Sequence, residues 1–313
     1  MRKRRIGIVG LGDIARKVYL PLLTSQESVE IVGLQSRTKE TVDRIGGQYR
    51  IDGRYTDLGD LVALQPDAVF VHSPTPTHYE IVMACLQAGI HVYVDKPLSY
   101  DLGESVRMAE EAAKRGLLLG VGFNRRFAPL YAEAKSWLEG AGGASWCSVQ
   151  KHRLRKQLLP ARETVYDDLI HMLDLLVWLG DGEDGELAAA ELEADIDGKM
   201  VRASGTVRLT GRGATGVYAM VRDAGRDLEK LELHGSGRSA EVVNMETGEW
   251  TEAGGMPVLR TFGSWDTVLE RRGFAGVVNH FLACLDDPDR CTVRADRVLA
   301  SHRLAERVAA GKL

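Results

Sequence analysis

The chain has 313 residues, 44% of them hydrophobic and 27% charged, which is typical of a globular protein and, at this length, of two domains. Its formal net charge of −4 excludes a general basic field, so we expect neither nucleic acid nor a membrane surface as a partner. No apolar run approaches the length of a membrane span, and the run after the basic N-terminus is too short for an export signal. We therefore expect a cytoplasmic protein.

The four cysteines are scattered along the chain and include no C-x-x-C pair. They are Cys85, Cys147, Cys284 and Cys291. This spacing indicates neither a disulfide framework nor a zinc site, so we expect no bound metal.

The first motif follows a short apolar run at 6–9, which indicates a buried strand. It has the pattern Gly10-x-Gly12-x-x-Ala15 and continues into a predicted helix. Strand, tight turn and helix in this order are the context in which the pattern binds a dinucleotide. Gly10 makes the turn, Gly12 lets the backbone approach a pyrophosphate, and Ala15 lets the helix pack closely on the strand. The pyrophosphate is expected at the free N–H groups of the helix start.

The end of the second predicted strand, 29–35, bears on the choice of cofactor. An NAD site usually has Asp or Glu at this point, whereas here Ser36, Arg37 and Thr38 follow without an acid. A carboxylate would repel a 2′-phosphate, while the guanidinium of Arg37 can bind it in bidentate fashion. We therefore expect NADP, with NAD as the alternative. The other interpretation of Arg37 is a solvated loop charge.

Strands and helices alternate through the first part of the chain, which predicts a doubly wound parallel sheet. The predicted strands are 6–9, 29–35, 68–72, 91–94 and 117–121, and the predicted helices are 15–23, 58–64, 78–88 and 102–115. Ligands bind at the carboxyl ends of such strands, so we expect site residues in the segments 73–78, 95–97 and 122–126. Lys96 is a candidate because it lies between a buried strand end and a proline.

The second part of the chain combines helices with short strands separated by turn signals, which predicts an antiparallel meander. The predicted strands are 145–152, 187–195, 201–209, 215–221, 228–234 and 240–244, and the predicted helices are 127–138, 164–179, 276–285 and 295–310.

The predicted helix at 164–179 carries Asp167, His171 and Asp174 on one face, because they are spaced by four and then three residues. Histidine titrates in the range needed to take a hydroxyl proton while a hydride leaves, and a neighbouring carboxylate can orient it. A structural histidine is the alternative, and Asp168 is a competing carboxylate within one turn. These residues are too few for a metal site.

A basic stretch at 151–156 follows a predicted strand. Charge runs usually face water, and this is the favoured interpretation. If His152 or Arg153 points towards the substrate instead, an anionic substrate such as a sugar acid is indicated.

Four motifs together resemble the Gfo/Idh/MocA oxidoreductase family, and the resemblance covers essentially the whole chain. They are the fingerprint at 10–15, the segment 68–74 with His78 after it, the segment 89–98, and Asp167-x-x-x-His171-x-x-Asp174. Within the family, the segments 94–98 and 121–131 are most similar to the MviM-like oxidoreductases. Two positions differ from the family pattern, which usually has Glu at Asp95 and commonly has Gly at Leu169.

The resemblance implies that Lys96, His171 and Asp167 carry proton transfer and alkoxide stabilisation. It also implies an open sheet in the second domain and assembly into a homodimer or homotetramer. The expected cofactor contacts are Gly10, Gly12, Asp13, Ile14, Ser36, Arg37, Ser73, Pro74, Thr75, His78, Asp95, Lys96 and Asn124. The expected substrate contacts are Arg125, His152, Arg153 and Asp174.

We therefore expect an α/β protein with a Rossmann domain at 1–123 and an α+β domain at 124–313, the latter with a large, mainly antiparallel sheet. The last helix could pack back on the first domain. The expected function is hydride transfer between NADP and a carbinol or carbonyl of a small sugar-like or polyol substrate. Asp95 and Leu169 motivate an alternative, a catalytically silent nucleotide-binding regulatory protein. A further alternative is an enzyme that cleaves a glycoside through transient oxidation.

Overall fold

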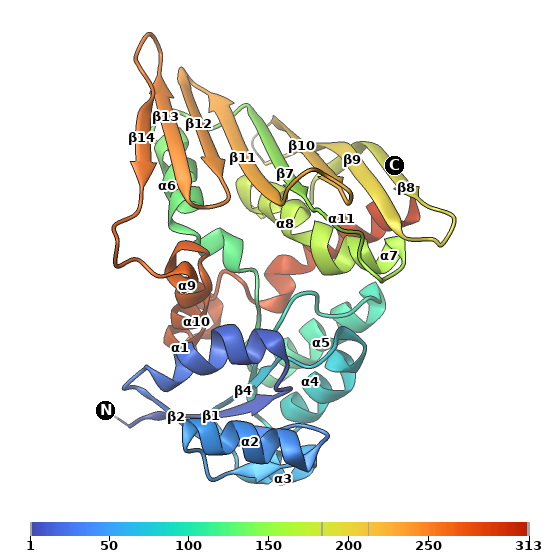
Figure 1. The fold of residues 1–313 in the computed structure, drawn as a ribbon, viewed down its shortest axis with the longest axis vertical. Coiled ribbons are helices and arrows are strands. Elements are labelled where there is room, and N and C mark those ends of the chain that lie inside the picture. The colour runs from blue at the N-terminus through green and yellow to red at the C-terminus, as the bar shows by residue number, and fades with distance from the viewer. Residues whose placement is uncertain (1, 183, 212, 312–313) are drawn as a thin grey trace. The chain divides into compact units, whose positions relative to one another are not determined.

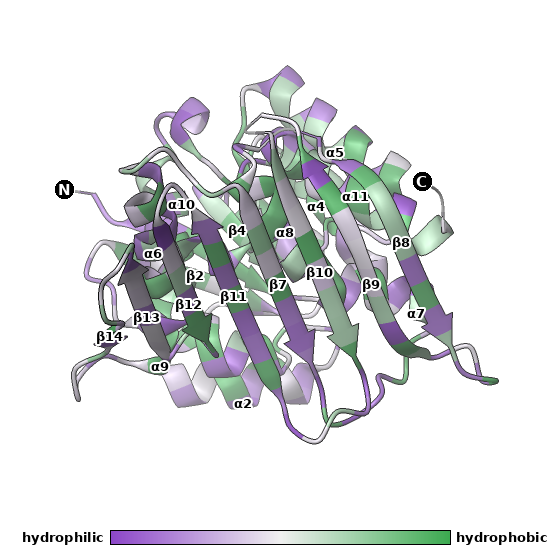
Figure 2. Cartoon of the chain, turned by 90° about the horizontal axis from the view of Figure 1, so that it is seen from above, coloured by the Kyte–Doolittle hydropathy of each residue, from purple (hydrophilic) through white to green (hydrophobic). Residues whose placement is uncertain are grey.

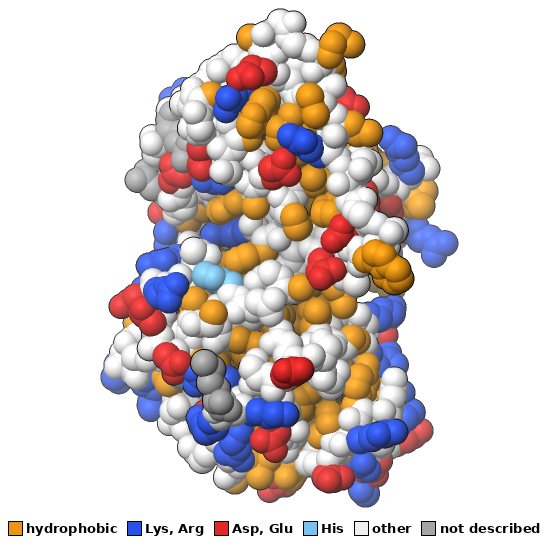
Figure 3. All heavy atoms as spheres, turned by 90° about the vertical axis from the view of Figure 1, so that its left-hand side faces the viewer, with side chains coloured by type: hydrophobic (Ala, Val, Ile, Leu, Met, Phe, Trp, Pro, Cys, Tyr) orange, Lys and Arg blue, Asp and Glu red, His pale blue; other side chains and the backbone are white. Residues whose placement is uncertain are grey.

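The computed structural model describes residues 2–182, 184–211 and 213–311. The chain divides into two compact units, one running to Gly122 and including Val278–Arg297, the other formed by Phe123–Val277 and the residues after Arg297. Among the described helices, none is both long enough and apolar enough to cross a membrane. Acidic and basic side chains are interspersed on the face drawn in Figure 3, as the small net charge suggests.

The first unit contains a six-stranded parallel sheet with the order β3-β2-β1-β4-β5-β6. Its strands are β1 (Arg4–Val9), β2 (Val29–Gln35), β3 (Arg54–Tyr55), β4 (Ala68–Val71), β5 (His91–Val94) and β6 (Leu119–Val121). Every residue of β4 is buried, as expected for a parallel strand covered on both faces. The strand order reverses between β1 and β4, which is the switch point where such sheets bind ligands.

Helices lie on both faces of this sheet (Figure 1). They are η1 (Ala15–Tyr19), α1 (Leu20–Thr24), α2 (Lys39–Tyr49), α3 (Leu58–Ala63), η2 (Thr75–Thr77), α4 (His78–Gln87) and α5 (Leu102–Arg115). The ends of α5 show why a helix forms there. The Asp101 carboxylate accepts a hydrogen bond from the Glu104 N–H at the start, and Gly116 adopts a left-handed conformation, φ 65°, at the end.

A later part of the chain completes the first unit with the second half of α10 (Phe274–Ala283) and with η5 (Pro288–Arg290). The Phe281 ring packs edge-on against Phe70 of β4 and Tyr93 of β5, with ring centroids 5.4 and 5.3 Å away. A side chain at Gly120 would meet Phe281 at 2.6 Å, so this glycine allows the close approach. Aromatic burial therefore holds this segment on the sheet.

The second unit contains an eight-stranded sheet with the order β14-β13-β12-β11-β7-β10-β9-β8 (Figure 2). Its strands are β7 (Trp146–His152), β8 (Glu186–Ala194), β9 (Met200–Leu209), β10 (Ala214–Val221), β11 (Leu228–Gly235), β12 (Arg238–Val243), β13 (Thr247–Glu252) and β14 (Val258–Thr261). The sheet corrects the predicted meander, because β7 inserts at its centre, antiparallel to β11 but parallel to β10. All other pairs are antiparallel.

Helices cover one face of this sheet, where α6 packs against β11–β13 and α8 against β7, β9 and β10. The helical segments of this unit include η3 (Asn124–Phe127), α6 (Pro129–Glu139), α7 (Ala161–Thr164), η4 (Val165–Leu169), α8 (Ile170–Leu179), α9 (Val268–Arg271) and most of α11 (Ala295–Ala310). Along β10, buried residues alternate with half-buried ones, so one side of the strand belongs to the core.

Three differences from the predicted elements have simple causes. The helix predicted from residue 164 begins at Ala161 and contains a π-helical turn, η4, which sequence periodicity does not reveal. β13 and β14 were not predicted, since the former is mostly polar and the latter is fully exposed at the sheet edge. α2 was not predicted because its sequence contains two adjacent glycines.

Candidate active site

A cavity of about 580 Å³ lies at the carboxyl ends of β1, β2 and β4 in the first unit. A cavity of this size at the switch point suits a small molecule or cofactor. Eight of the expected cofactor contacts line it: Gly10, Gly12, Asp13, Ile14, Ser36, Arg37, Ser73 and Pro74. Sequence reasoning missed His72, Thr41, Leu58, Thr77 and Ile81, which also line it.

The two fingerprint glycines differ in what surrounds them. Gly10 has φ 84°, and a Cβ there would lie 2.5 Å from the backbone nitrogen of Ser73 and 2.6 Å from the carbonyl carbon of His72. Only glycine fits this close approach between the turn after β1 and the segment after β4. A Cβ on Gly12 would have no atom within 4 Å, so this position opens onto free space. The turn therefore has the shape of a cradle for a pyrophosphate.

The contrast between the glycines predicts different effects of Gly10→Ala and Gly12→Ala. Gly10→Ala is expected to destabilise the apo protein by about 1–3 kcal/mol, because it combines a positive φ with a backbone clash. Gly12→Ala should leave stability unchanged and weaken NADPH binding, because its Cβ occupies the cradle. Thermal unfolding without cofactor and NADPH titration measure the two effects. Equal stability of the two variants would contradict this account of the turn.

The β2 end of the cavity has a polar and cationic lining without an acid. Its residues are Gln35, Ser36, Arg37, Thr38 and Thr41. The carboxylate of Asp13 lies elsewhere in the lining and pairs with Lys17 and Arg16, which lower its pKa. The exposed Arg37 therefore has no neighbouring acid in this part of the cavity wall.

Behind the cavity, Asp95 is held from two sides. Its carboxylate accepts hydrogen bonds from the Tyr19 hydroxyl at 2.7 Å and from His72 Nδ1 at 3.0 Å, and the two rings stack with centroids 3.8 Å apart. Burial raises the pKa of Asp95, but the interactions with His72 and Tyr19 outweigh it, so the pKa lies below its ordinary value. The shorter acid at the family's Glu position is thus firmly anchored, directly before the half-buried Lys96.

The His72 side chain is fully buried beneath the cavity, where its ring stacks on Tyr19 and its Nδ1 meets Asp95. The fit of a cofactor therefore rests on the turn after β1. The open cradle at Gly12 fits the pyrophosphate of a dinucleotide.

The remaining expected cofactor contacts do not line the cavity. The two ring nitrogens of the buried His78 lie 2.9 Å from the carbonyl oxygens of Pro97 and Ser73, which ties two loops together. Burial lowers the pKa of His78. Thr75 is buried, and Asn124 belongs to the second unit, where its side-chain amide donates to the Arg272 carbonyl at 2.7 Å.

In the second unit, the predicted proton-transfer residues lie on η4 and the start of α8. The Asp167 carboxylate accepts a hydrogen bond from Gln157, and His171 is 7% exposed. Leu169, at the family's glycine position, is fully buried. π-helical turns are rare and occur frequently at functional sites. Both this segment and the helix after the fingerprint contain one.

The competing carboxylate, Asp168, is already engaged. It forms ion pairs with Lys151 and Arg222, and Arg153 Nε lies 3.6 Å from it. Burial raises the pKa of Asp168, but these cations lower it far below its ordinary value. Asp168 is therefore a fixed anion.

The four expected substrate contacts have different surroundings. Arg125 forms a bidentate ion pair with Glu229. Asp174, 1% exposed, accepts two hydrogen bonds from Arg126 at 2.6 and 2.9 Å and one from Ser301 at 2.7 Å. Asp174 thus connects three segments of the second unit instead of facing an open site.

The other two expected substrate contacts, His152 and Arg153, are adjacent residues at the end of β7. His152 Nδ1 accepts a hydrogen bond from the Val221 N–H at 3.1 Å. Arg153 lies near Asp168 and Asp227 and lines a second cavity.

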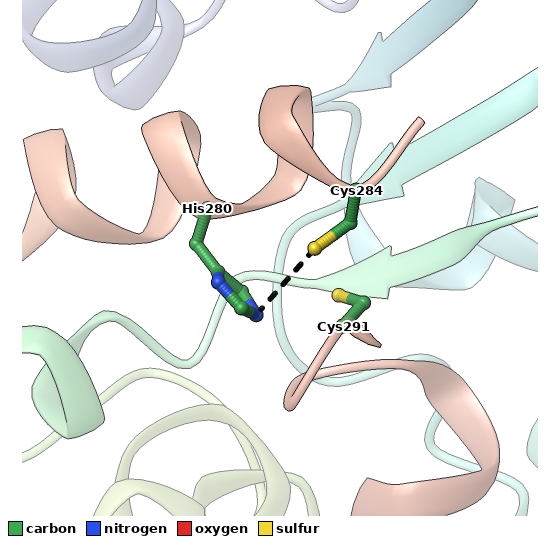
Figure 4. Close-up of side chains that lie close together, drawn as sticks. All are labelled: His280, Cys284 and Cys291. Carbon is green, nitrogen blue, oxygen red and sulfur yellow. Dashed lines mark hydrogen bonds between the residues drawn. The ribbon is translucent and has the colours of Figure 1, made fainter. Parts of the chain in front are cut away.

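A cluster that the cysteine spacing did not indicate lies in the first unit (Figure 4). Ligand atoms of His280, Cys284 and Cys291 lie within 4.8 Å of one another. His280 Nε2 accepts a hydrogen bond from the Thr292 N–H at 2.9 Å, so its lone pair is in use. Burial raises the pKa of both thiols, that of Cys291 to about 12, whereas thiolates are the metal-binding form. Burial therefore favours the neutral thiol form of both cysteines.

Comparisons with known proteins match both parts of the chain. A family model described as "Oxidoreductase family, NAD-binding Rossmann fold" matches residues 4–123, and one described as "YceM-like, C-terminal domain" matches residues 129–253. The protein named "Putative oxidoreductase YceM" from Salmonella typhimurium is 38% identical over 309 residues, 98% of this chain and 97% of that protein.

Two further relatives cover different shares of the chain. The crystal structure of the dehydrogenase MviM from Clostridium difficile has a TM-score of 0.92 and 33% identity, and the match covers 99% of this chain and 100% of that one. A myo-inositol 2-dehydrogenase from Thermotoga maritima is 34% identical over 140 residues, 43% of this chain and 40% of that protein.

Proposed function

Because this chain belongs to the Gfo/Idh/MocA family of NAD(P)-binding oxidoreductases, we propose that it transfers a hydride between NADP and a carbinol or carbonyl carbon of a small sugar-like or polyol substrate. The main support for the proposal is the cavity at the switch point. The turn at Gly12 leaves room there for a pyrophosphate, and the lining at the end of β2 contains no acidic residue. The name of the inositol dehydrogenase relative supports the polyol class.

We assign the proton chemistry to three side chains. The bound nicotinamide would supply or accept the hydride. The ammonium of Lys96 stabilises alkoxide character on the substrate oxygen, and His171 exchanges the hydroxyl proton. Asp167 orients the imidazole and stabilises its charged form. We assign this role to Asp167 because Asp168 forms ion pairs with Lys151 and Arg222. The anchoring of Asp95 by Tyr19 and His72 supports this assignment, because it fixes the backbone before Lys96.

The NADP preference rests on Arg37, and Arg37→Gln tests it. The variant should bind NADPH about 10-fold to 100-fold more weakly, because it loses charge-assisted hydrogen bonds to the 2′-phosphate, while NADH affinity stays nearly constant. Fluorescence titration with both cofactors measures the ratio. Lys39→Gln removes a neighbouring exposed charge that does not line the cavity and serves as the control. An equal loss of affinity for NADPH and NADH in Arg37→Gln would contradict the preference.

A further inference from the structure

The second unit contains a cavity of about 280 Å³ with a mainly cationic wall. Its lining residues are Arg153, Leu154, Arg155, Arg222 and Asp227. Arg155 is exposed and makes no hydrogen bond or ion pair with any described residue. A concave surface with three guanidinium groups and one carboxylate favours anions, which guanidinium groups bind in bidentate geometry.

Further charged side chains lie behind this wall. Lys151 and Arg222 form ion pairs with Asp168, which also lies 3.6 Å from Arg153, and Arg153 in turn lies 3.8 Å from Asp227. Burial, followed by the charge of Arg125, lowers the pKa of Lys151 to about 7. Negative charge stabilises buried cations, and a bound anion would add to that of Asp168 and Asp227.

Arg222 gives an independent indication of a missing acceptor. This residue is 5% exposed and lines the cavity, and one of its side-chain nitrogens donates to Asp168. Its Nε–H is buried and has no hydrogen-bond partner among the described residues. Buried donors are normally satisfied, so an acceptor oxygen of a ligand suits this position.

The cavity is linked to the proposed proton-transfer residue through η4. Asp168 binds two of the arginines that line the cavity and precedes His171 by three residues, which is about one helical turn or 5 Å along the axis. The cationic wall therefore contacts the same helical segment that carries His171.

We propose that this cavity binds a carboxylate or phosphate group of the substrate, so that the enzyme acts on a sugar acid or a sugar phosphate in preference to a neutral polyol. This inference rests on the proposed function, because it places the anionic group on the substrate of His171. Arg155 and Arg153 bind the anion from the solvent side, and Arg222 binds it from the buried side.

Isothermal titration of the NADP-loaded full-length protein tests the proposal directly. The probes are D-gluconate, D-glucose 6-phosphate, inorganic phosphate and the neutral D-glucitol. At least one anion is expected to bind ten or more times more tightly than D-glucitol, and a comparison of gluconate with the phosphates distinguishes a carboxylate site from a phosphate site. Failure of all three anions to bind at millimolar concentration would overturn the proposal.

Arg155→Gln provides the matched variant, because Arg155 is exposed and makes no hydrogen bond or ion pair with the described residues, so the change should not disturb folding. It should weaken anion binding about 10-fold, which corresponds to one lost charge-assisted hydrogen bond, and leave D-glucitol binding unchanged. Arg208→Gln is the control, because it removes an exposed arginine at the opposite end of β9 and β10. It should change neither the affinity for anions nor the affinity for D-glucitol. Unchanged anion affinity in Arg155→Gln would overturn the proposal.

The hydride-transfer assay separates this inference from the proposed function. Arg155-dependent anion binding without any hydride transfer would contradict the function and leave the anion site in place. Turnover of a sugar acid or a sugar phosphate at the same kcat/KM in the wild type and in Arg155→Gln would support the function and overturn the anion site.

Discussion

Replacement of Lys96 with methionine is expected to reduce hydride transfer on the order of 10²–10³-fold and to leave NADPH affinity nearly unchanged. Methionine keeps much of the length and apolar bulk of the side chain but removes the ammonium that stabilises the developing alkoxide. Lys96 does not line the cofactor cavity, so binding and chemistry should separate cleanly. Single-turnover measurements of reduced-nicotinamide absorbance and an independent NADPH titration provide the two readouts.

Lys114→Met is the matched control, because it removes an exposed lysine from the last turn of α5 in the same unit. It should behave like the wild type in both measurements. Unchanged turnover in Lys96→Met would remove Lys96 from the mechanism. Loss of NADPH binding in that variant would instead show that Lys96 serves the cofactor.

The second large effect concerns stability, and it distinguishes the two neighbouring aspartates. Asp168→Asn should destabilise the second unit by about 3–5 kcal/mol, because it leaves Lys151 and Arg222 buried without their shared anion. Asp167→Asn makes the same chemical change one residue earlier and should lower turnover while altering stability by less than about 1 kcal/mol. All five tryptophans lie within 123–277, so urea unfolding followed by tryptophan fluorescence reports on this unit.

The stabilisation by Asp168 should also depend on pH. Because the pKa of Asp168 is lowered in the folded protein, its contribution is complete above the unfolded value of about 4 and decreases as the pH falls towards the folded value. The stability difference between the wild type and Asp168→Asn should therefore shrink below about pH 4. A difference that stays constant between pH 7 and pH 3 would show that an ionised carboxylate is not responsible.

The cavity at the switch point was predictable because its sequence signals are local. Gly10, Gly12 and Arg37 lie at positions fixed by strand, turn and helix within a short stretch of sequence, and all three line the cavity. The doubly wound sheet followed from the same alternation, and the structure confirms it. His72 was missed although it directly follows β4, since only the fold shows that it contacts Asp95 and the cavity.

The second unit was less predictable because its determinants are distant in sequence. Asp168 meets Arg222 across 54 residues, and Arg125 meets Glu229 across 104. No periodicity reports such pairs, so the sequence left Asp167 and Asp168 as competitors. The central insertion of β7 and the π-helical turn likewise depend on tertiary packing and change which side chains meet.

Deuterium transfer tests the central claim most directly. The protein is incubated with NADPH deuterated at C4 of the nicotinamide, using each of the two C4 epimers in turn, and with a panel of keto-sugars, keto-sugar acids and keto-sugar phosphates. Mass spectrometry then locates the label. The proposed function predicts one deuterium on a carbon that bears a hydroxyl group, from one epimer only, and labelling slowed by about 10²–10³-fold with Lys96→Met. Tight NADPH binding without deuterium transfer to any compound would contradict the enzyme and favour a silent nucleotide-binding protein.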